Sequence, residues 1–248
     1  MTTLHANETE TSELAAAAAH ALNNVIAVLY AASSYLKSPA NPRSLERATR
    51  ALGDACGSAL RLSAALSLLA LPPAGRLHVP AGGQEIRPED LTRVMETLEA
   101  ATNARSSGQD AVGEPVNATL DRDTLQSLLL CAGAVLRRAA GRDAPLRCDV
   151  LLTVGGSGTP GRLEFELSYD ASVTADAPRS SGDPCELALA HATAHLTVLA
   201  TKMERSRPGR IRLCVYLVYR FINILTNCQV NARSNFFHRK TTGLRFIS

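Results

Sequence analysis

The sequence predicts an α+β fold in which an antiparallel helical hairpin precedes a mixed domain of helices and strands. Two long alanine- and leucine-rich segments, 14–36 and 45–71, contain no proline and are typical of helices. Beyond residue 88, helical periodicity gives way to strand-like alternation and back again. A Pro- and Gly-rich stretch lies between the two parts. We therefore predict a hairpin domain at 11–71, a linker at 72–88, a mixed domain at 89–218 and an atypical tail at 219–248.

The hairpin carries apolar residues three and four apart along both helices, which is the spacing of a coiled-coil seam. In the first helix these are Ala15, Ala18, Leu22, Val25, Leu29, Ala32 and Leu36. The segment 37–42 holds two prolines, so one helix ends and an antiparallel one begins there. One hairpin cannot cover such a seam, whereas two hairpins packed as a four-helix bundle can, so we expect a homodimer. The alternative is that both helices pack on the rest of the chain.

The second part alternates helices with strands. In order, the pattern predicts a helix from 88 to 104, an extended segment at 115–120, a helix at 123–140, strands at 148–154 and 163–169, a helix at 185–203 and a strand at 209–218. A glycine-rich turn joins the first two of these strands. The tail differs in composition, since 211–248 holds four of the five phenylalanines and one alanine.

Bulk properties exclude several classes of protein. The net charge is only +3 and the basic residues are scattered, so neither nucleic acid nor a membrane surface is an expected partner. No signal peptide and no run of about 18 apolar residues is present, which predicts a cytoplasmic protein without a membrane span. The six cysteines show no metal-ligand spacing, so we expect reduced, mostly packed thiols and no bound metal.

His20 is the residue that points to chemistry. With Leu22 as heptad position a, His20 falls at position f, farthest from the seam, and is expected to face solvent. Asn24 lies four residues on, within reach on the same face, and Asn23 precedes it. Adjacent asparagines are poor helix formers, which indicates that polar groups are wanted there to orient a water or a phosphoryl oxygen.

The stretch from Ala19 to Leu29, AHALNNVIAVL, resembles the phosphoacceptor motif of bacterial sensor histidine kinases. The resemblance implies that a ring nitrogen of His20 accepts phosphate, that Asn24 supports it, and that a response-regulator receiver domain is the partner. Kinases of this family usually carry an acidic residue directly after the histidine, to help remove its proton. Here that residue is Ala21, which cannot take up a proton, and this argues against self-phosphorylation.

The second part resembles the ATP-binding domain shared by histidine kinases, gyrase-type ATPases and Hsp90-like chaperones. Cys131 and Val135 stand where the family has two magnesium-binding asparagines, and neither offers an oxygen ligand. Asp170 stands at the adenine-reading aspartate, but the glycines that follow it in the family are missing. The lid region 174–184 lacks a GxG signature. We therefore expect a degenerate histidine-kinase-like α/β sandwich without a cofactor, with Asp170 as the one residual nucleotide-site candidate.

The expected function is histidine phosphotransfer in a bacterial two-component phosphorelay, with His20 passing phosphate between response-regulator aspartates. Receiver domains are the expected partners, and a hybrid histidine kinase is a further candidate. Two alternatives remain open. One is a divergent sensor histidine kinase that autophosphorylates from ATP and magnesium. The other is a non-catalytic pseudokinase, for which changing His20 to alanine leaves signalling unchanged.

Overall fold

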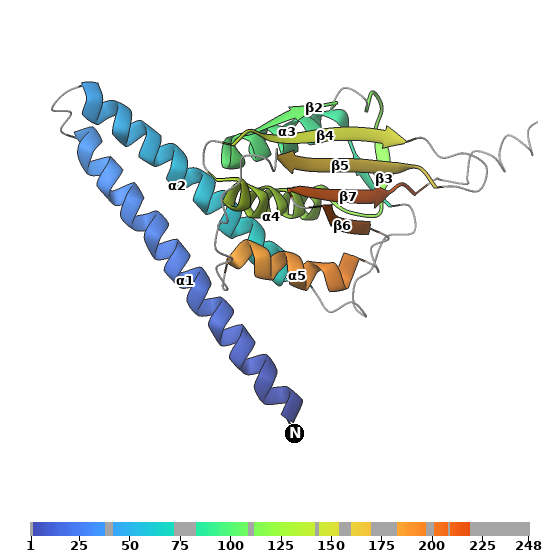
Figure 1. The fold of residues 1–248 in the computed structure, drawn as a ribbon, viewed down its shortest axis with the longest axis horizontal. Coiled ribbons are helices and arrows are strands. Elements are labelled where there is room, and N and C mark those ends of the chain that lie inside the picture. Colours follow the sequence, from blue (N-terminus) through green and yellow to red (C-terminus); the bar gives the residue numbers. More distant parts are fainter. Residues whose placement is uncertain are drawn as a thin grey trace, which may run out of the picture.

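A computed structural model gives the fold of the chain (Figure 1). It describes residues 2–37, 42–71, 83–108, 112–141, 144–153, 160–169, 183–196, 201–207 and 209–218. A helical hairpin is followed by a mixed domain, so the predicted α+β class is confirmed. None of the helices within these ranges has the length and apolar character needed to cross a membrane.

The hairpin consists of α1 (Thr2–Lys37) and α2 (Pro42–Leu69). Small and branched residues of the predicted seam are buried between the two helices. They are Val25 and Ala32 of α1 and Ala48 and Ala55 of α2. The two helices diverge away from their connection (Figure 1). Helix α1 also starts well before residue 14, because no glycine or proline interrupts the preceding residues.

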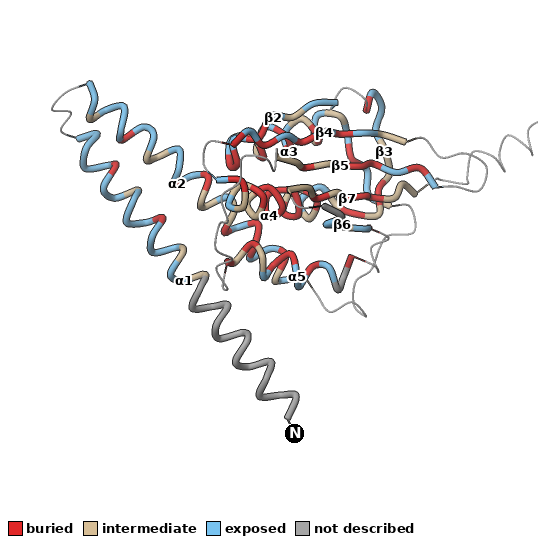
Figure 2. Tube along the Cα trace, viewed as in Figure 1, coloured by how far each residue is buried: buried red, intermediate tan, exposed pale blue. Residues whose placement is uncertain are grey.

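Much of the apolar surface of the hairpin stays uncovered within the single chain. Leu22, Ile26 and Tyr30 are 49%, 53% and 78% exposed. They follow one another at intervals of four residues and so form a single stripe along α1. Figure 2 shows the described part of α1 as mostly exposed. This stripe, Leu22–Ile26–Tyr30, is called the α1 stripe below.

The mixed domain is built on a five-stranded sheet with the order β2-β4-β5-β7-β6. Its strands are β2 (Ala104–Ser107), β4 (Leu146–Thr153), β5 (Arg162–Tyr169), β6 (Thr201–Arg207) and β7 (Arg210–Tyr216). The β2–β4 pair is parallel and the remaining pairs are antiparallel. A small second sheet pairs β1 (Gln84–Ile86) with β3 (Val116–Ala118).

The five-stranded sheet is apolar on one face and polar on the other. In β4, Leu146, Cys148 and Val150 are buried, whereas Arg147 and Asp149 between them are exposed. This period of two is what one covered face requires. The covering helices are α3 (Pro88–Thr102), α4 (Arg122–Ala140) and α5 (Pro184–Leu196), which lie together on the buried face (Figures 1 and 2).

The open face of the sheet is held by charge pairs across neighbouring strands. Glu166 of β5 meets Arg210 at 3.2 Å and Arg212 at 3.1 Å, both from β7. These pairs are partly solvated and contribute little each. Because the charged side chains on this face stay in contact with water, the face needs no covering layer.

The bounds of the helix predicted at 185–203 are wrong. The helix expected to run to Met203 ends at Leu196, and 201–207 form β6 instead. Thr201 and Met203 pair with Val215 and Leu213 of β7, while Lys202 lies on the outer side. Pairing in the sheet therefore overrides the helical periodicity of the preceding residues.

Helix α2 lies outside the helix layer and packs on α3, α4 and α5. Ala64, Ala65 and Leu68 of α2 are buried and belong to the same core as the sheet and its helices. The idea that the hairpin packs on the rest of the chain thus holds for one face of α2. Most of the predicted linker (72–82) and the tail (219–248) lie outside the described residues.

Five of the six cysteines fall within the described residues, and each of those five is a free thiol. Cys56 is exposed, and the other four, Cys131, Cys148, Cys185 and Cys214, are buried. For the described part of the chain, the expectation of mostly packed thiols is therefore confirmed, and their reduced state stays a prediction.

Candidate functional site

His20 and Asn24 lie one helical turn apart on α1, and both are exposed. Val25, which is buried against α2, points about 140° around the helix axis from His20. The imidazole therefore faces solvent, as its heptad position predicts. Solvent access on a regular helix is what a histidine needs to reach a group presented by a second protein.

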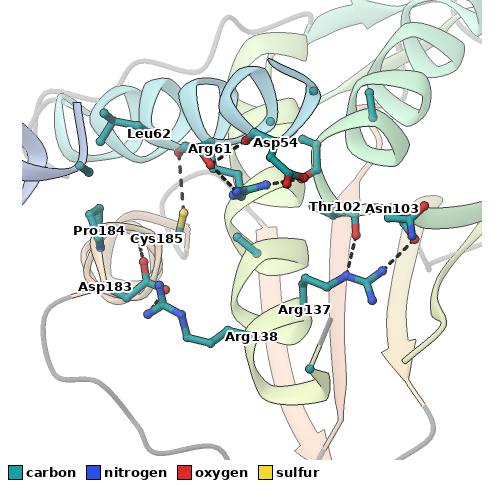
Figure 3. A pocket seen from close by; sticks show the side chains of 18 residues that line it. Asp54, Arg61, Leu62, Thr102, Asn103, Arg137, Arg138, Asp183, Pro184 and Cys185 are labelled. Atoms are coloured by element: carbon teal, nitrogen blue, oxygen red, sulfur yellow. Dashed lines mark hydrogen bonds and ion pairs between the residues drawn. The ribbon is translucent and has the colours of Figure 1, made fainter. Parts of the chain in front are cut away.

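A polar recess of about 750 Å³ borders the turn of α1 that carries His20 (Figure 3). Ala21 lies on its wall, opposite the ends of α3 and α4 and the start of α5. Its charged lining side chains are Asp54, Arg61, Arg137, Arg138 and Asp183. The recess thus brings charged groups of α2 and of the second half of the chain close to Ala21, the residue after His20.

Two of the arginines are held by the carboxyl end of α3. Arg137 donates from Nε to the Thr102 carbonyl at 2.7 Å and from Nη2 to the Asn103 carbonyl at 2.8 Å. Arg61 donates to the carbonyl of Ala101. Burial lowers the pKa of both guanidinium groups. These cations offset the negative end of the α3 dipole, so their first role is structural.

The third arginine ties α4 to α5. Arg138 Nη1 lies 2.8 Å from Oδ2 of Asp183, whose side chain is 7% exposed. Oδ1 of the same carboxylate accepts a hydrogen bond from the backbone N–H of Cys185 at 3.1 Å. The Asp183 carboxylate thereby caps the N-terminus of α5 and forms an ion pair with Arg138 of α4 (Figure 3).

The positions that the family resemblance assigns to magnesium ligands are closed to solvent or apolar. Cys131 is fully buried, and a hydrogen bond between its thiol and that of Cys185, together with burial, raises the pKa of Cys131. The Cys185 thiol donates to the Arg61 carbonyl of α2 at 3.7 Å. Val135 packs against the core. Helices α2 and α5 thus cover α4 around Cys131.

Among the described residues, no group of three or more His, Cys, Asp or Glu side chains is arranged to hold a metal ion. Asp170, the residual nucleotide-site candidate, lies outside the described residues, as does the lid region up to 182.

The charged residues of the recess carry only weak signals in the sequence. These signals are an arginine pair in the last turn of α4 and an aspartate directly before Pro184. Both patterns are typical of ordinary helix ends. Whether these residues meet depends on how α2 packs, which local sequence does not reveal.

No protein-family model matches the sequence, and no curated protein matches it. Solved structures are similar to the chain. A structure titled as a bacterial phosphotransferase has 13% identity and a TM-score of 0.44, and the match covers 83% of this chain and 94% of that one. The mycobacterial sensor histidine kinase MprB has 12% identity and a TM-score of 0.35, with 54% of this chain and 98% of that one covered.

The histidine kinase AdeS of Acinetobacter baumannii has 13% identity and a TM-score of 0.37, and the match covers 80% of this chain and 96% of that one. Each of these three TM-scores is below 0.5, so the three structures do not define a substrate, partner or activity for this chain.

Proposed function

We propose that this chain is a dimeric histidine phosphotransferase of a bacterial two-component phosphorelay. His20 receives phosphate from the aspartate of one receiver domain and passes it to the aspartate of another. A lone pair on a ring nitrogen of His20 attacks phosphorus, a P–N bond forms, and the P–O bond to the aspartate breaks. The carboxylate leaves with the electron pair, and the second transfer reverses these steps on another carboxylate.

The observation that carries the proposal is the exposed imidazole of His20 with the exposed amide of Asn24 one turn away. A relay histidine has to supply only a nucleophile that a receiver domain can approach, because the receiver brings its own metal and acid groups. The Asn24 amide can donate a hydrogen bond to a phosphoryl oxygen. No other group of this chain is required for the chemical step.

The buried position of Cys131 supports a phosphate source other than ATP. A kinase needs oxygen ligands for magnesium and a cleft for the triphosphate. Here the corresponding face of α4 is covered by α2 and α5, and Cys131 is fully buried. Together with Ala21 after the histidine, this favours a relay over an autokinase.

The α1 stripe supports the dimer. Leu22, Ile26 and Tyr30 remain exposed when α1 packs on α2. An exposed, contiguous apolar stripe usually marks an interface with another protein. A second copy of the hairpin presents the same stripe in a two-fold arrangement and buries both in a four-helix bundle.

The test uses two purified receiver domains of the same pathway, one loaded with labelled phosphate. The wild-type chain is expected to move label from the first receiver to the second, and the His20→Ala variant is expected to move none. Nucleotide binding is measured in parallel with a fluorescent ATP analogue and magnesium. Saturable binding together with label transfer from ATP would replace the proposal by the autokinase. Equal relay by the His20→Ala variant would also refute it.

A further inference from the structure

We infer that α2 is a shared structural helix, so that the second half of the chain is a permanent support for the His20 hairpin and not a domain that moves against it. This concerns the packing of the chain and can be tested without phosphate. Its meaning for function rests on the proposed phosphotransfer, since it explains what the second half contributes once ATP is not used.

The first support is the composition of the core. Ala65 and Leu68 of α2 are 0% exposed, and Ala64 is 4% exposed. All three contact the cluster formed by the sheet and by α3, α4 and α5, while Ala48 and Ala55 of the same helix pack on α1. One helix therefore serves two cores, which couples the orientation of α1 to the sheet.

The second support is a close approach of backbones at Gly57. A Cβ at this position would lie 3.3 Å from the carbonyl oxygen and 3.4 Å from the Cα of Ala101 in α3. Gly53, one turn earlier, has nothing within 4 Å of the corresponding position. A side chain at position 57 would therefore crowd the backbone of α3, whereas a side chain at position 53 of the same helix would not.

The third support is a set of polar bonds that cross between the hairpin and the second half. Arg61 of α2 donates to the Ala101 carbonyl of α3, and its own carbonyl accepts from the Cys185 thiol of α5 (Figure 3). Each bond adds modestly to the association, because water replaces it when the two parts separate. Apolar burial, close approach and polar bonds all oppose separation of α2 from the second half.

This packing has a mechanistic consequence. A domain that passes phosphate from a bound nucleotide to a histidine has to bring the reacting atoms to about 3–3.5 Å, so a domain held away from the histidine has to move toward it. A second half that shares its core with α2 cannot move relative to α2 without losing its own packing. It instead holds α2, and through α2 the helix α1, in one orientation.

The test is to cut the full-length chain within 72–82, after inserting a site-specific protease sequence there, with an affinity tag after residue 248. Wild type, Gly57→Leu, Arg61→Ala and the matched control Gly53→Leu are cleaved and captured, and the fraction of the 1–71 half retained is measured over time. Far-UV circular dichroism of the uncut proteins shows which variants fold. Arg61→Ala is the second test variant because it removes a bond between the two halves without adding a larger side chain.

The two halves of wild type and of Gly53→Leu are expected to stay associated. In Gly57→Leu the dissociation rate is expected to rise at least about tenfold. Overpacking a tight helix contact weakens the association by a free energy that corresponds to a factor of this size. Arg61→Ala is expected to shift the rate in the same direction. Rapid separation of the wild-type halves, or equal retention in all four proteins, would overturn the inference. Neither outcome depends on phosphotransfer, so a failed relay assay would not be confused with either of them.

Discussion

At the scale of single residues, the candidate site is defined by what surrounds His20 on its own helix. The ring is exposed, and Asn24 is the polar side chain one turn further on. Asn23 is also exposed but points about 60° to the other side of His20. The two asparagines therefore form a natural pair of test and control.

Asn24→Ala is expected to slow phosphate transfer to and from His20 by about tenfold or more, because the amide no longer orients a phosphoryl oxygen. Asn23→Ala, which leaves that hydrogen bond intact, is expected to transfer at close to the wild-type rate. The measurement is the single-turnover rate with a labelled receiver domain. Equal rates for the two variants would remove Asn24 from the site.

Cys148 gives a prediction about pH. Burial in β4 raises the pKa of its thiol to about 12 from an ordinary value of 9.0. The folded chain therefore keeps this proton between pH 9 and 12, where the unfolded chain loses it. The free energy of unfolding should thus be unaffected by this group below pH 9 and fall above it, by up to about 1.4 kcal/mol per pH unit.

The check is urea denaturation at pH 8, 9.5 and 10.5 for wild type, Cys148→Ala and Cys56→Ala. Removing Cys148 is expected to flatten the alkaline loss of stability, whereas removing the exposed Cys56 should leave the slope unchanged. A wild-type slope in Cys148→Ala would show that the buried thiol does not contribute.

The sequence predicted the exposure of His20 and its neighbour Asn24, since a heptad position fixes the direction of a side chain on a helix. It did not predict the surroundings of Arg61, Arg137 and Asp183. These groups come from α2, from α4 and from the residue before α5, and their meeting depends on tertiary packing alone.

At the scale of elements, the contact between α3 and α4 depends on Gly133. A Cβ there would lie 2.9 Å from Leu98 Cδ1 and 3.0 Å from Thr102 Cγ2, both in α3. Leu98 and Thr102 are themselves buried, so they have little room to move. This glycine lets α4 approach α3 closely above the sheet.

Gly133→Leu is expected to lower the free energy of unfolding by about 1–3 kcal/mol through overpacking. Gly53→Leu is expected to leave it unchanged or raise it slightly, because its surroundings are open and leucine favours a helix. Chemical denaturation of both variants measures the difference. Equal stability would show that the α3–α4 contact can relax around a side chain.

Long helices with a clear period were predictable, whereas three of the strands were not. The pattern found α1, α2 and α4 because each holds its period over several turns. It missed β1, β2 and β6, whose residues pair with partners distant in the chain. Register and pairing supply the stability of such strands, and their local sequence carries little of it.

At the scale of the whole molecule, the hairpin has two apolar faces, one covered within the chain and one uncovered. The second half of the same chain covers one face of α2, which the sequence left open only as an alternative. The α1 stripe stays uncovered, which is where we place the second copy. A periodic apolar pattern shows that a face is buried but does not tell which partner buries it.

The double variant Leu22→Glu with Ile26→Glu is expected to be a monomer of 26.3 kDa, while the wild-type chain is expected to have twice this mass. Charged residues in the stripe would have to be buried in the bundle at a high cost. Tyr35→Glu, on the opposite side of α1, is the control and is expected to remain a dimer. Light scattering after gel filtration measures the masses, and a monomeric wild type would refute the dimer.

The most direct test of the central claim is to locate the phosphate on the chain itself. The purified protein is incubated with ATP and magnesium or with a phosphorylated receiver domain, and tandem mass spectrometry under non-acidic conditions identifies the modified residue. We predict phosphate on His20 after incubation with the receiver and none after incubation with ATP. Phosphate from ATP alone, or phosphate from the receiver on any residue other than His20, would contradict the proposed phosphotransferase.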